Sequence, residues 1–305
     1  MFKMRKVVIV GAGHVGSHVA LNLVQSGEAD DIVLIDILRE KAAGQALDLD
    51  DAISASLCHK DATVRAGSYE ELNDADILVI AFGREIYKGE TRLDMFDDTI
   101  RMANEVLTHL KKVDIICEYI RRKMHWQPRR CICTGTSLET CRLLRILSEL
   151  TGYKRSSIQG FCMGEHGNSS FVVWSHVMIQ GIPFVELRKT KAAWRKISLT
   201  DLQDQVRQAG YLVADGKGCT EFGIANAAGM LISAIFHDQK LVWPCSTALE
   251  GKYGQQGVAC GVPCVIGKKG VEQILEINLL PEERVALEKS CEIIRSFLDR
   301  AEQVK

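Results

Sequence analysis

The sequence predicts an α/β protein, with a doubly wound parallel sheet in the first half and a mixed α and β domain in the second. Short apolar runs rich in β-branched residues alternate with helical spacing over the first half. A glycine-rich turn directly follows the first of these runs. The chain of 305 residues is long enough for two domains with separate cores, which we place at residues 1–136 and 137–305.

The first strand, turn and helix predict a dinucleotide site. Val7–Val10 is an unbroken apolar run, typical of a strand buried on both faces. Gly11-Ala12-Gly13-His14-Val15-Gly16 follows at once, and residues 17–26 have helical spacing that ends at Gly27. Glycines let the backbone turn tightly and approach a pyrophosphate, which binds the amide groups at the start of the helix.

Asp36 indicates which dinucleotide binds. A second strand, Ile32–Ile35, leads to Asp36, twenty residues beyond Gly16. A carboxylate at this position accepts hydrogen bonds from both ribose hydroxyls of adenosine and repels a 2′-phosphate. The alternative is an ordinary strand–helix–strand unit with a glycine turn. The strand, the spacing and the acid together favour the dinucleotide site, with NAD rather than NADP as the cofactor.

The remainder of the first half continues the alternation. We expect a helix over 40–56, strands over 63–66 and 77–81, a loop over 82–92 and a helix over 97–112. The loop contains Gly83 and Gly89 and follows the carboxyl end of a strand, where parallel sheets bind ligands.

No fifth strand is evident after Lys112. Apolar residues continue at spacings of three and four across this point, although 115–120 has the composition of a short strand. We therefore expect residues 97–124 to be helical, as one helix or as two abutting helices. Cys131–Cys133 then reads as a strand, and Ser137 as the cap of a helix that runs to Leu150.

The second half has a different pattern, typical of a mixed α and β domain. Strand-like runs and helical segments follow one another without regular alternation, and glycines separate the shorter runs. We expect strands over 157–163, 171–187 (with a turn at 181–183), 241–246 and 258–266, and helices over 199–214, 220–238 and from Pro281 onward.

The composition argues against several classes of protein. A net charge of -1 gives no general attraction to nucleic acid or to an anionic membrane. The basic residues within 121–130 read as a solvated helix end in preference to a nucleic-acid patch. No segment is long and apolar enough to span a membrane. The 11 cysteines include no CxxC pair, which predicts reduced thiols in a cytoplasmic protein and no metal site.

One histidine and two arginines are candidates for chemistry. His166 lies between glycines in Gly164-Glu165-His166-Gly167, after a strand-like run, so its ring is reachable from a cleft. A single histidine is more often structural than catalytic. Two arginines favour a catalytic role for this histidine in a substrate site. They are Arg142, at the start of a helix, and Arg92, at the end of the glycine-containing loop.

These motifs, in this order, resemble the NAD-dependent L-2-hydroxyacid dehydrogenases of the lactate and malate dehydrogenase family. The likeness is greatest to the L-lactate and L-2-hydroxyisocaproate branches and covers nearly the whole chain. The motifs that carry it are 11–16, Gly89-Glu90-Thr91-Arg92, Gly135-Thr136, Arg142, 164–167, Thr220, Gly261-Val262-Pro263 and Gly270-Val271-Glu272.

The resemblance implies a Rossmann-type NAD-binding domain, a substrate domain and specific residue roles. His166 would be the acid–base group, oriented by Glu139, and Arg92 would polarise the substrate oxygen. Arg142 would bind the substrate carboxylate, in a pocket that Thr220 and Ile86 also line. The implied NAD-binding residues are Gly11, Gly13, His14, Val15, Gly16, Asp36, Ala81 and Gly83. The family also implies a homotetramer or homodimer.

Three departures from the family pattern are visible. Glu139 replaces the aspartate that orients the histidine. About a dozen residues are missing between Lys112 and Val113, including the fifth strand and its terminal Ser-Asn-Pro. The loop is one residue longer than is typical, so that either Glu85 or Ile86 occupies the position that selects the substrate side chain.

We therefore expect an enzyme that interconverts L-2-hydroxy and 2-oxo monocarboxylic acids with NAD. Two alternatives remain: a protein that binds NAD without turnover, and an unstable product of a truncated gene. Glu139 and the missing strand favour the first of them. A missing central strand predicts early melting and weak turnover, which a reinserted strand ending in Ser-Asn-Pro would correct.

Overall fold

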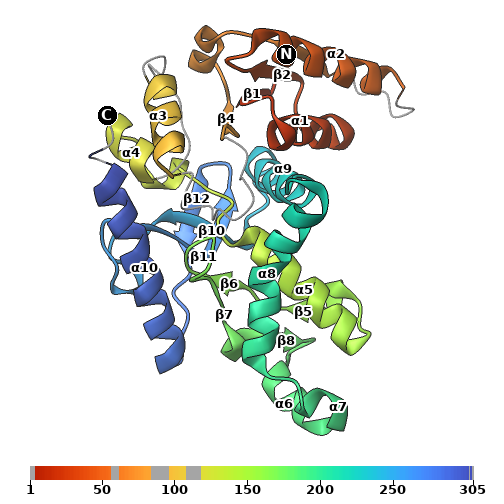
Figure 1. The fold of residues 1–305 in the computed structure, drawn as a ribbon, viewed down its shortest axis with the longest axis vertical. Coiled ribbons are helices and arrows are strands. Elements are labelled where there is room, and N and C mark those ends of the chain that lie inside the picture. The colour runs from red at the N-terminus through yellow and green to blue at the C-terminus, as the bar shows by residue number, and fades with distance from the viewer. Residues whose placement is uncertain (1–3, 56–61, 84–95, 108–117, 302, 304–305) are drawn as a thin grey trace.

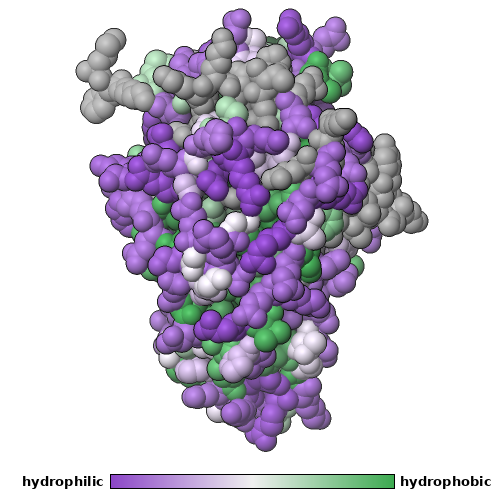
Figure 2. Space-filling view, turned by 90° about the vertical axis from the view of Figure 1, so that its left-hand side faces the viewer, coloured by the Kyte–Doolittle hydropathy of each residue, from purple (hydrophilic) through white to green (hydrophobic). Residues whose placement is uncertain are grey.

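The computed structural model describes residues 4–55, 62–83, 96–107, 118–301 and 303. Figure 1 shows the first sheet and its helices at one end of the molecule, and the short strands and helices of the second half toward the other. Hydrophilic residues predominate on the face shown in Figure 2, with apolar residues in narrow patches between them. No helix in the described ranges combines the length and apolarity needed to cross a membrane.

The first half forms a parallel sheet, as the alternation predicts. Its strands are β1 (Lys6–Val10), β2 (Asp31–Ile35), β3 (Thr63–Ala66) and β4 (Ile77–Ile80). The order is β3-β2-β1-β4, and every neighbouring pair is parallel. Alternate residues of β1 enter two different cores, Val7 and Ile9 on one face and Val8 and Val10 on the other. Burial on both faces explains why the strand is apolar without interruption.

Helices cover both faces of this sheet. The helices α1 (His14–Ser26) and α2 (Arg39–Ser54) alternate with the first strands. The helices α3 (Phe96–Leu107) and α4 (Glu118–Met124) follow β4, and their junction lies outside the described residues. Apolar residues of α3 and α4 share a small core with the end of the last helix, α10 (Pro281–Ala301). Both helices lie within the range predicted to be helical, and the predicted continuity across residues 108–117 lies outside the described residues.

Cys131–Cys133 does not join the parallel sheet. Instead, Cys133 forms an isolated antiparallel bridge with Ser246, through two N–H···O bonds of 2.9 Å. Within the described part of the chain, β4 therefore pairs with β1 alone and is the edge of the sheet. The prediction of a strand at 131–133 is wrong, because only Cys133 forms a bridge and its partner comes from the second half of the chain.

A cavity of about 310 Å³ runs along β4. Every residue from 76 to 81 lines it, and its other walls come from α1, the helix α9 described below, Arg130, and residues 132–134 and 268–270. The space lies where a further strand of a parallel sheet would pack. Among the described residues, no other strand pairs with β4 at the position that the missing strand would occupy.

The second half consists of helices around short antiparallel strands. Its helices are α5 (Ser137–Thr151), α6 (Phe184–Thr190), α7 (Ala192–Arg195), α8 (Leu199–Lys217), α9 (Phe222–Phe236) and α10. Its main sheet has the order β10 (Leu241–Ala248), β11 (Ala259–Gly267) and β12 (Gly270–Ile274). The smaller strands are β5 (Ile158–Gln159), β6 (Cys162–Met163), β7 (Phe171–Val172), β8 (Met178–Ile179) and β9 (Ile182–Pro183).

The long strand predicted over 171–187 is therefore broken, and its end is helical. Pro183 has φ -57°, which suits the start of a helix, and α6 begins at the next residue. Phe184 is 1% exposed and stacks on Trp174 at a centroid distance of 5.9 Å. Burial of one aromatic side chain, which local composition does not reveal, selects the helix here.

The helix α9 joins the two halves (Figure 1). Ala225 and Ile232 enter the core beside the parallel sheet, whereas Leu231 and Ala234 enter the core of the second sheet. A helix that is apolar all round is one buried on several sides. At Gly229 an added Cβ would lie 1.8 Å from Oδ1 of Asn22, so the glycine leaves room for this side chain of α1 against α9.

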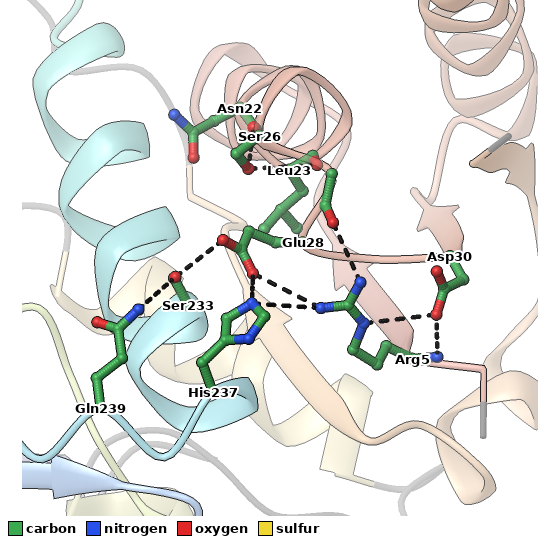
Figure 3. A network of polar contacts seen from close by, with 10 residues as sticks. Arg5, Asn22, Leu23, Ser26, Glu28, Asp30, Ser233, His237 and Gln239 are labelled. Atoms are coloured by element: carbon green, nitrogen blue, oxygen red, sulfur yellow. Dashed lines mark hydrogen bonds and ion pairs between the residues drawn. The ribbon is translucent and has the colours of Figure 1, made fainter. Parts of the chain in front are cut away.

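A polar network closes the same junction at its solvent side (Figure 3). Ser233 and His237, at the end of α9, contact Glu28, which follows α1. Arg5, at the entry to β1, lies 3.8 Å from the Glu28 carboxylate and also pairs with Asp30 at 3.5 Å. The boundary between residues 136 and 137 stays a prediction.

Candidate active site

The glycine loop is packed against the end of β4. Gly11 has φ +104°, and an added Cβ would lie 2.7 Å from the carbonyl carbon of Ala81. A Cβ on Gly16 would lie 1.8 Å from the Gly11 oxygen. Both positions therefore require glycine. The helix α1 begins at His14, three residues before the predicted start, so the loop leads directly into its first turn.

The remaining features of the loop fit a dinucleotide. A Cβ on Gly13 would meet nothing nearer than the Lys41 ammonium at 3.9 Å, so the backbone here faces open space beside a cation. Asp36 accepts hydrogen bonds from the N–H groups of Ala12 at 2.8 Å and Leu38 at 3.0 Å. These bonds hold the carboxylate at the carboxyl end of β2, beside the loop. The described residues thus fit a pyrophosphate at the helix and an adenosine ribose at Asp36.

A histidine, a glutamate and an arginine converge in the second domain. Nδ1 of His166 lies 2.6 Å from Oε1 of Glu139, and Nη1 of Arg142 lies 3.5 Å from the same oxygen. Glu139 is only 3% exposed, whereas 29% of the His166 side chain is exposed. Burial alone would raise the pKa of the Glu139 carboxyl, but the His166 and Arg142 charges lower that pKa overall.

The first two turns of α5 hold two of these residues. Glu139 and Arg142 are three positions apart on this helix and therefore share a face. Thr136, not Ser137, is the N-cap residue, and no side chain caps the helix. The Ser137 hydroxyl donates instead to the Pro244 carbonyl at 2.7 Å, which ties the start of the helix to β10.

The loop that carries His166 is anchored from α10. The Glu165 N–H donates to the Ser290 hydroxyl at 2.6 Å, and the Ser290 and Ser169 hydroxyls lie 2.9 Å apart. Gly164, at φ +103°, leaves no room for a side chain, because its Cβ would lie 2.7 Å from the Ser290 oxygen. Ser290 is fully buried, and sequence reasoning missed it because nothing local marks a serine on the last helix.

Arg142 is held against the backbone of α8. It is 9% exposed, and a Cβ on Gly210 would lie 3.1 Å from both of its terminal nitrogens. Gly210 was not among the predicted site residues. A glycine inside a helical pattern is the signal that marks such a position.

Some of the other predicted site residues lie within the described part of the chain, and others do not. Thr220 is half-buried immediately before α9, and Ala81 and Gly83 follow β4. Arg92, Glu85 and Ile86 lie outside the described residues, as does most of the predicted loop. The structure thus brings together His166, Glu139 and Arg142, and separately Gly11, Gly13, Gly16 and Asp36.

The fold and the two sites define a two-domain dehydrogenase that uses NAD. The model of the lactate/malate dehydrogenase NAD-binding domain matches residues 5–120. The model of the lactate/malate dehydrogenase α/β C-terminal domain matches residues 136–304. The chain belongs to the lactate/malate dehydrogenase family, whose members interconvert 2-hydroxy acids and 2-oxo acids.

Individual relatives agree with this assignment. The chain is 38% identical to an L-lactate dehydrogenase of Fusobacterium nucleatum, over 100% of this chain and 99% of the relative. It is 35% identical to an L-lactate dehydrogenase of Priestia megaterium, over 98% and 97% of the two chains. The solved structure of a minor L-lactate dehydrogenase from Enterococcus mundtii has a TM-score of 0.90 at 30% identity, with 97% and 98% coverage.

The comparison also bears on the missing strand. The alignment with the Fusobacterium protein spans 319 positions, against 305 residues here, so at least 14 positions have no counterpart in this chain. A gap of that size accommodates the dozen residues expected between Lys112 and Val113.

Proposed function

We propose that the chain is an L-lactate-type dehydrogenase that reduces 2-oxo monocarboxylic acids and oxidises L-2-hydroxy acids. The observation that carries this proposal is that His166 and Arg142 both contact one carboxylate oxygen of Glu139. An acid–base group beside a largely buried guanidinium suits a substrate that has a carboxylate next to a carbonyl or hydroxyl group.

His166 is the acid–base group in this proposal. A neutral imidazole carries one N–H and one acceptor nitrogen. With Nδ1 held at Glu139, Nε2 is the nitrogen that exchanges a proton with the substrate oxygen. During oxidation Nε2 accepts the hydroxyl proton, and the Glu139 carboxylate stabilises the resulting imidazolium. During reduction the same proton returns to the carbonyl oxygen.

Arg142 binds the substrate carboxylate. Its guanidinium fork matches two carboxylate oxygens, and its burial strengthens the ion pair because little water screens it. Glu139 is the competitor, since one of its oxygens lies 3.5 Å from Nη1. Arg92, Thr220 and Ile86 complete the substrate site by family resemblance.

The N-terminal loop holds the cofactor. NAD, when bound, supplies the nicotinamide that accepts or donates the hydride. The amide groups at the start of α1 bind its pyrophosphate, and Asp36 binds the adenosine ribose. Support for this comes from the open backbone at Gly13 and the fixed Asp36 carboxylate. The other cofactor-binding residues in the proposal are Gly11, His14, Val15, Gly16, Ala81 and Gly83.

The substrate side chain, the assembly and the location are also proposals. An apolar side chain is expected because Ile86 leaves a second carboxylate without a partner. A homotetramer or homodimer and a cytoplasmic location rest on the family resemblance. Oxaloacetate should therefore be a poor substrate, and a 2-oxo acid such as 2-oxoisocaproate a better one.

Steady-state reduction of pyruvate, 2-oxoisocaproate and oxaloacetate, followed through NADH absorbance, tests the proposal. His166→Gln should lower kcat by about 10³-fold or more without changing the affinity for NADH. His237→Gln, which removes an exposed histidine at the far end of α9, is the matched control and should keep full activity. NADH binding without turnover of any of the three acids would overturn the proposal.

A further inference from the structure

A second cluster of polar side chains lies beside the dinucleotide loop. His14 and His18 are one turn apart on α1, and Cys219 and Glu221 lie in the short connection between α8 and α9. The His14 side chain is 61% exposed, whereas the Glu221 side chain is only 8% exposed. The cluster therefore has an accessible side and a buried side.

Three of these residues have the geometry of a metal site. One ligand atom each from His14, Cys219 and Glu221 lies within 4.8 Å of the other two. Nδ1 of His14 lies 3.1 Å from Oε2 of Glu221. Bonds of about 2.0–2.3 Å in a tetrahedral zinc site put neighbouring ligand atoms roughly 3.4 Å apart. A modest side-chain adjustment would complete such a site.

The Glu221 carboxylate points independently to a cation. Its Oε1 pairs with the Lys217 ammonium. Its Oε2 is buried and has no hydrogen-bond partner among the described residues. A buried carboxylate oxygen without a hydrogen bond is costly unless a cation approaches it, and Oε2 lies 3.1 Å from Nδ1 of His14 and 3.4 Å from Nδ1 of His18.

His18 supports the cluster without being a ligand through Nδ1. That nitrogen lies 2.7 Å from the His14 carbonyl oxygen and must carry a proton, because a carbonyl oxygen only accepts. The His18 ring packs edge-on against Phe222, with the centroids 4.7 Å apart. Three protein ligands therefore remain, and a fourth tetrahedral position stays open to water or a solute.

We propose that His14, Cys219 and Glu221 bind one divalent cation of the zinc or cobalt type. A nitrogen, a sulfur and an oxygen donor together select Zn²⁺ or Co²⁺ over Mg²⁺ and Ca²⁺, which prefer oxygen alone. The Cys219 thiol gives up its proton when the cation binds. The proposal concerns binding alone and is independent of the substrate that the enzyme uses. Residues two hundred positions apart form the site, so cysteine spacing could not predict it.

Titration of the cofactor-free protein with Co²⁺ tests this site. A thiolate–cobalt charge-transfer band should grow to one equivalent per chain, and Zn²⁺ should abolish it while Mg²⁺ should not. Cys219→Ser should remove the band. His14→Gln and Glu221→Gln should each weaken Co²⁺ binding by roughly tenfold or more. Circular dichroism of each variant establishes that it has folded.

Two control variants separate this site from the other histidines and thiols. Cys141→Ser removes an exposed thiol on α5 and should leave the band unchanged. His237→Gln removes a histidine that also contacts a glutamate, at 2.7 Å, in the network of Figure 3. The His237→Gln variant should also bind one equivalent of Co²⁺ per chain. Persistence of the band in folded Cys219→Ser, its absence from the unmodified chain, or equal Co²⁺ affinity in all variants would overturn the proposal.

Discussion

Nδ1 of His166 lies 2.6 Å from Oε1 of Glu139, a carboxylate on the first turn of α5. The same oxygen lies 3.5 Å from the guanidinium of Arg142. In the proposed mechanism, one buried carboxylate thus orients the acid–base group His166 and neutralises the substrate-binding cation Arg142. A glutamate reaches both groups from a helix position where the family resemblance leads one to expect the shorter aspartate.

Removal of the Glu139 charge should therefore damage catalysis. We expect Glu139→Gln to lower kcat by about 10³–10⁴-fold, because the imidazolium loses its stabilising partner. Glu139→Asp keeps the charge and should lose much less. Steady-state rates and NADH binding measured on both variants test this. Unchanged kcat in the glutamine variant would exclude an orienting role for Glu139.

Gly210 should control the affinity for the substrate carboxylate. A Cβ there would lie 3.1 Å from both Nη atoms of Arg142, so Gly210→Ala should displace the guanidinium. The expected result is a several-fold rise in KM for the 2-oxo acid with unchanged NADH affinity. Gly216→Ala on the same helix is the control, since its Cβ meets nothing within 4 Å. Equal KM values in the two variants would contradict the prediction.

Cofactor choice should depend on Asp36. Its carboxylate is held by the Ala12 and Leu38 amides, and a 2′-phosphate beside it would be repelled. The unmodified chain should prefer NADH, and Asp36→Ser should raise kcat/KM for NADPH relative to NADH by roughly tenfold. Comparable turnover with both cofactors in the unmodified chain would show this reading of Asp36 to be wrong.

Glu71 should make stability depend on pH in the acid range. Hydrogen bonds from Arg65 and Lys6 lower the pKa of Glu71 to about 2 from a usual value of 4.5. A lowered folded-state pKa stabilises the protein above about pH 4.5, and this stabilisation is lost as pH falls toward 2. Glu71→Gln should cost about 1 kcal/mol at pH 7, because the pair is partly exposed.

Urea unfolding of both proteins between pH 2 and pH 7 tests the Glu71 prediction. The difference in free energy of unfolding should shrink as the pH falls. A difference that stays constant over this range would mean that Glu71 acts through packing and not through its charge.

The cavity beside β4 should limit both stability and turnover. A strand of four buried aliphatic side chains contributes roughly 1.5–3 kcal/mol per side chain. That sum is comparable with the ~5–15 kcal/mol that stabilises a whole domain. Insertion between Lys112 and Val113 of an apolar strand ending in Ser-Asn-Pro should raise Tm and kcat. A glycine–serine insert of equal length is the control, and a cooperative melt of the unmodified chain above about 60 °C would refute the idea.

Local sequence patterns were sufficient to predict those elements whose conformation depends on a single stretch of the chain. The strand at β1, the glycine turn and Asp36 lie within one short unit, in which alternation, spacing and chemistry are all local. The same reasoning failed where a distant partner decides the conformation. Cys133 bridges to Ser246 and not to β4, and the strand β12 was missed altogether.

By itself the sequence determined the two-part α/β fold and the NAD cofactor, and it predicted the residue types of the candidate active site. Only the tertiary structure brought Glu139 within 2.6 Å of His166, set Ser290 behind the histidine loop and placed Gly210 against Arg142. It also brought His14 to Glu221 across two hundred residues. The physical reason is that hydrophobic periodicity and turn chemistry act over a few residues, whereas a site depends on distances set by the packing of whole elements.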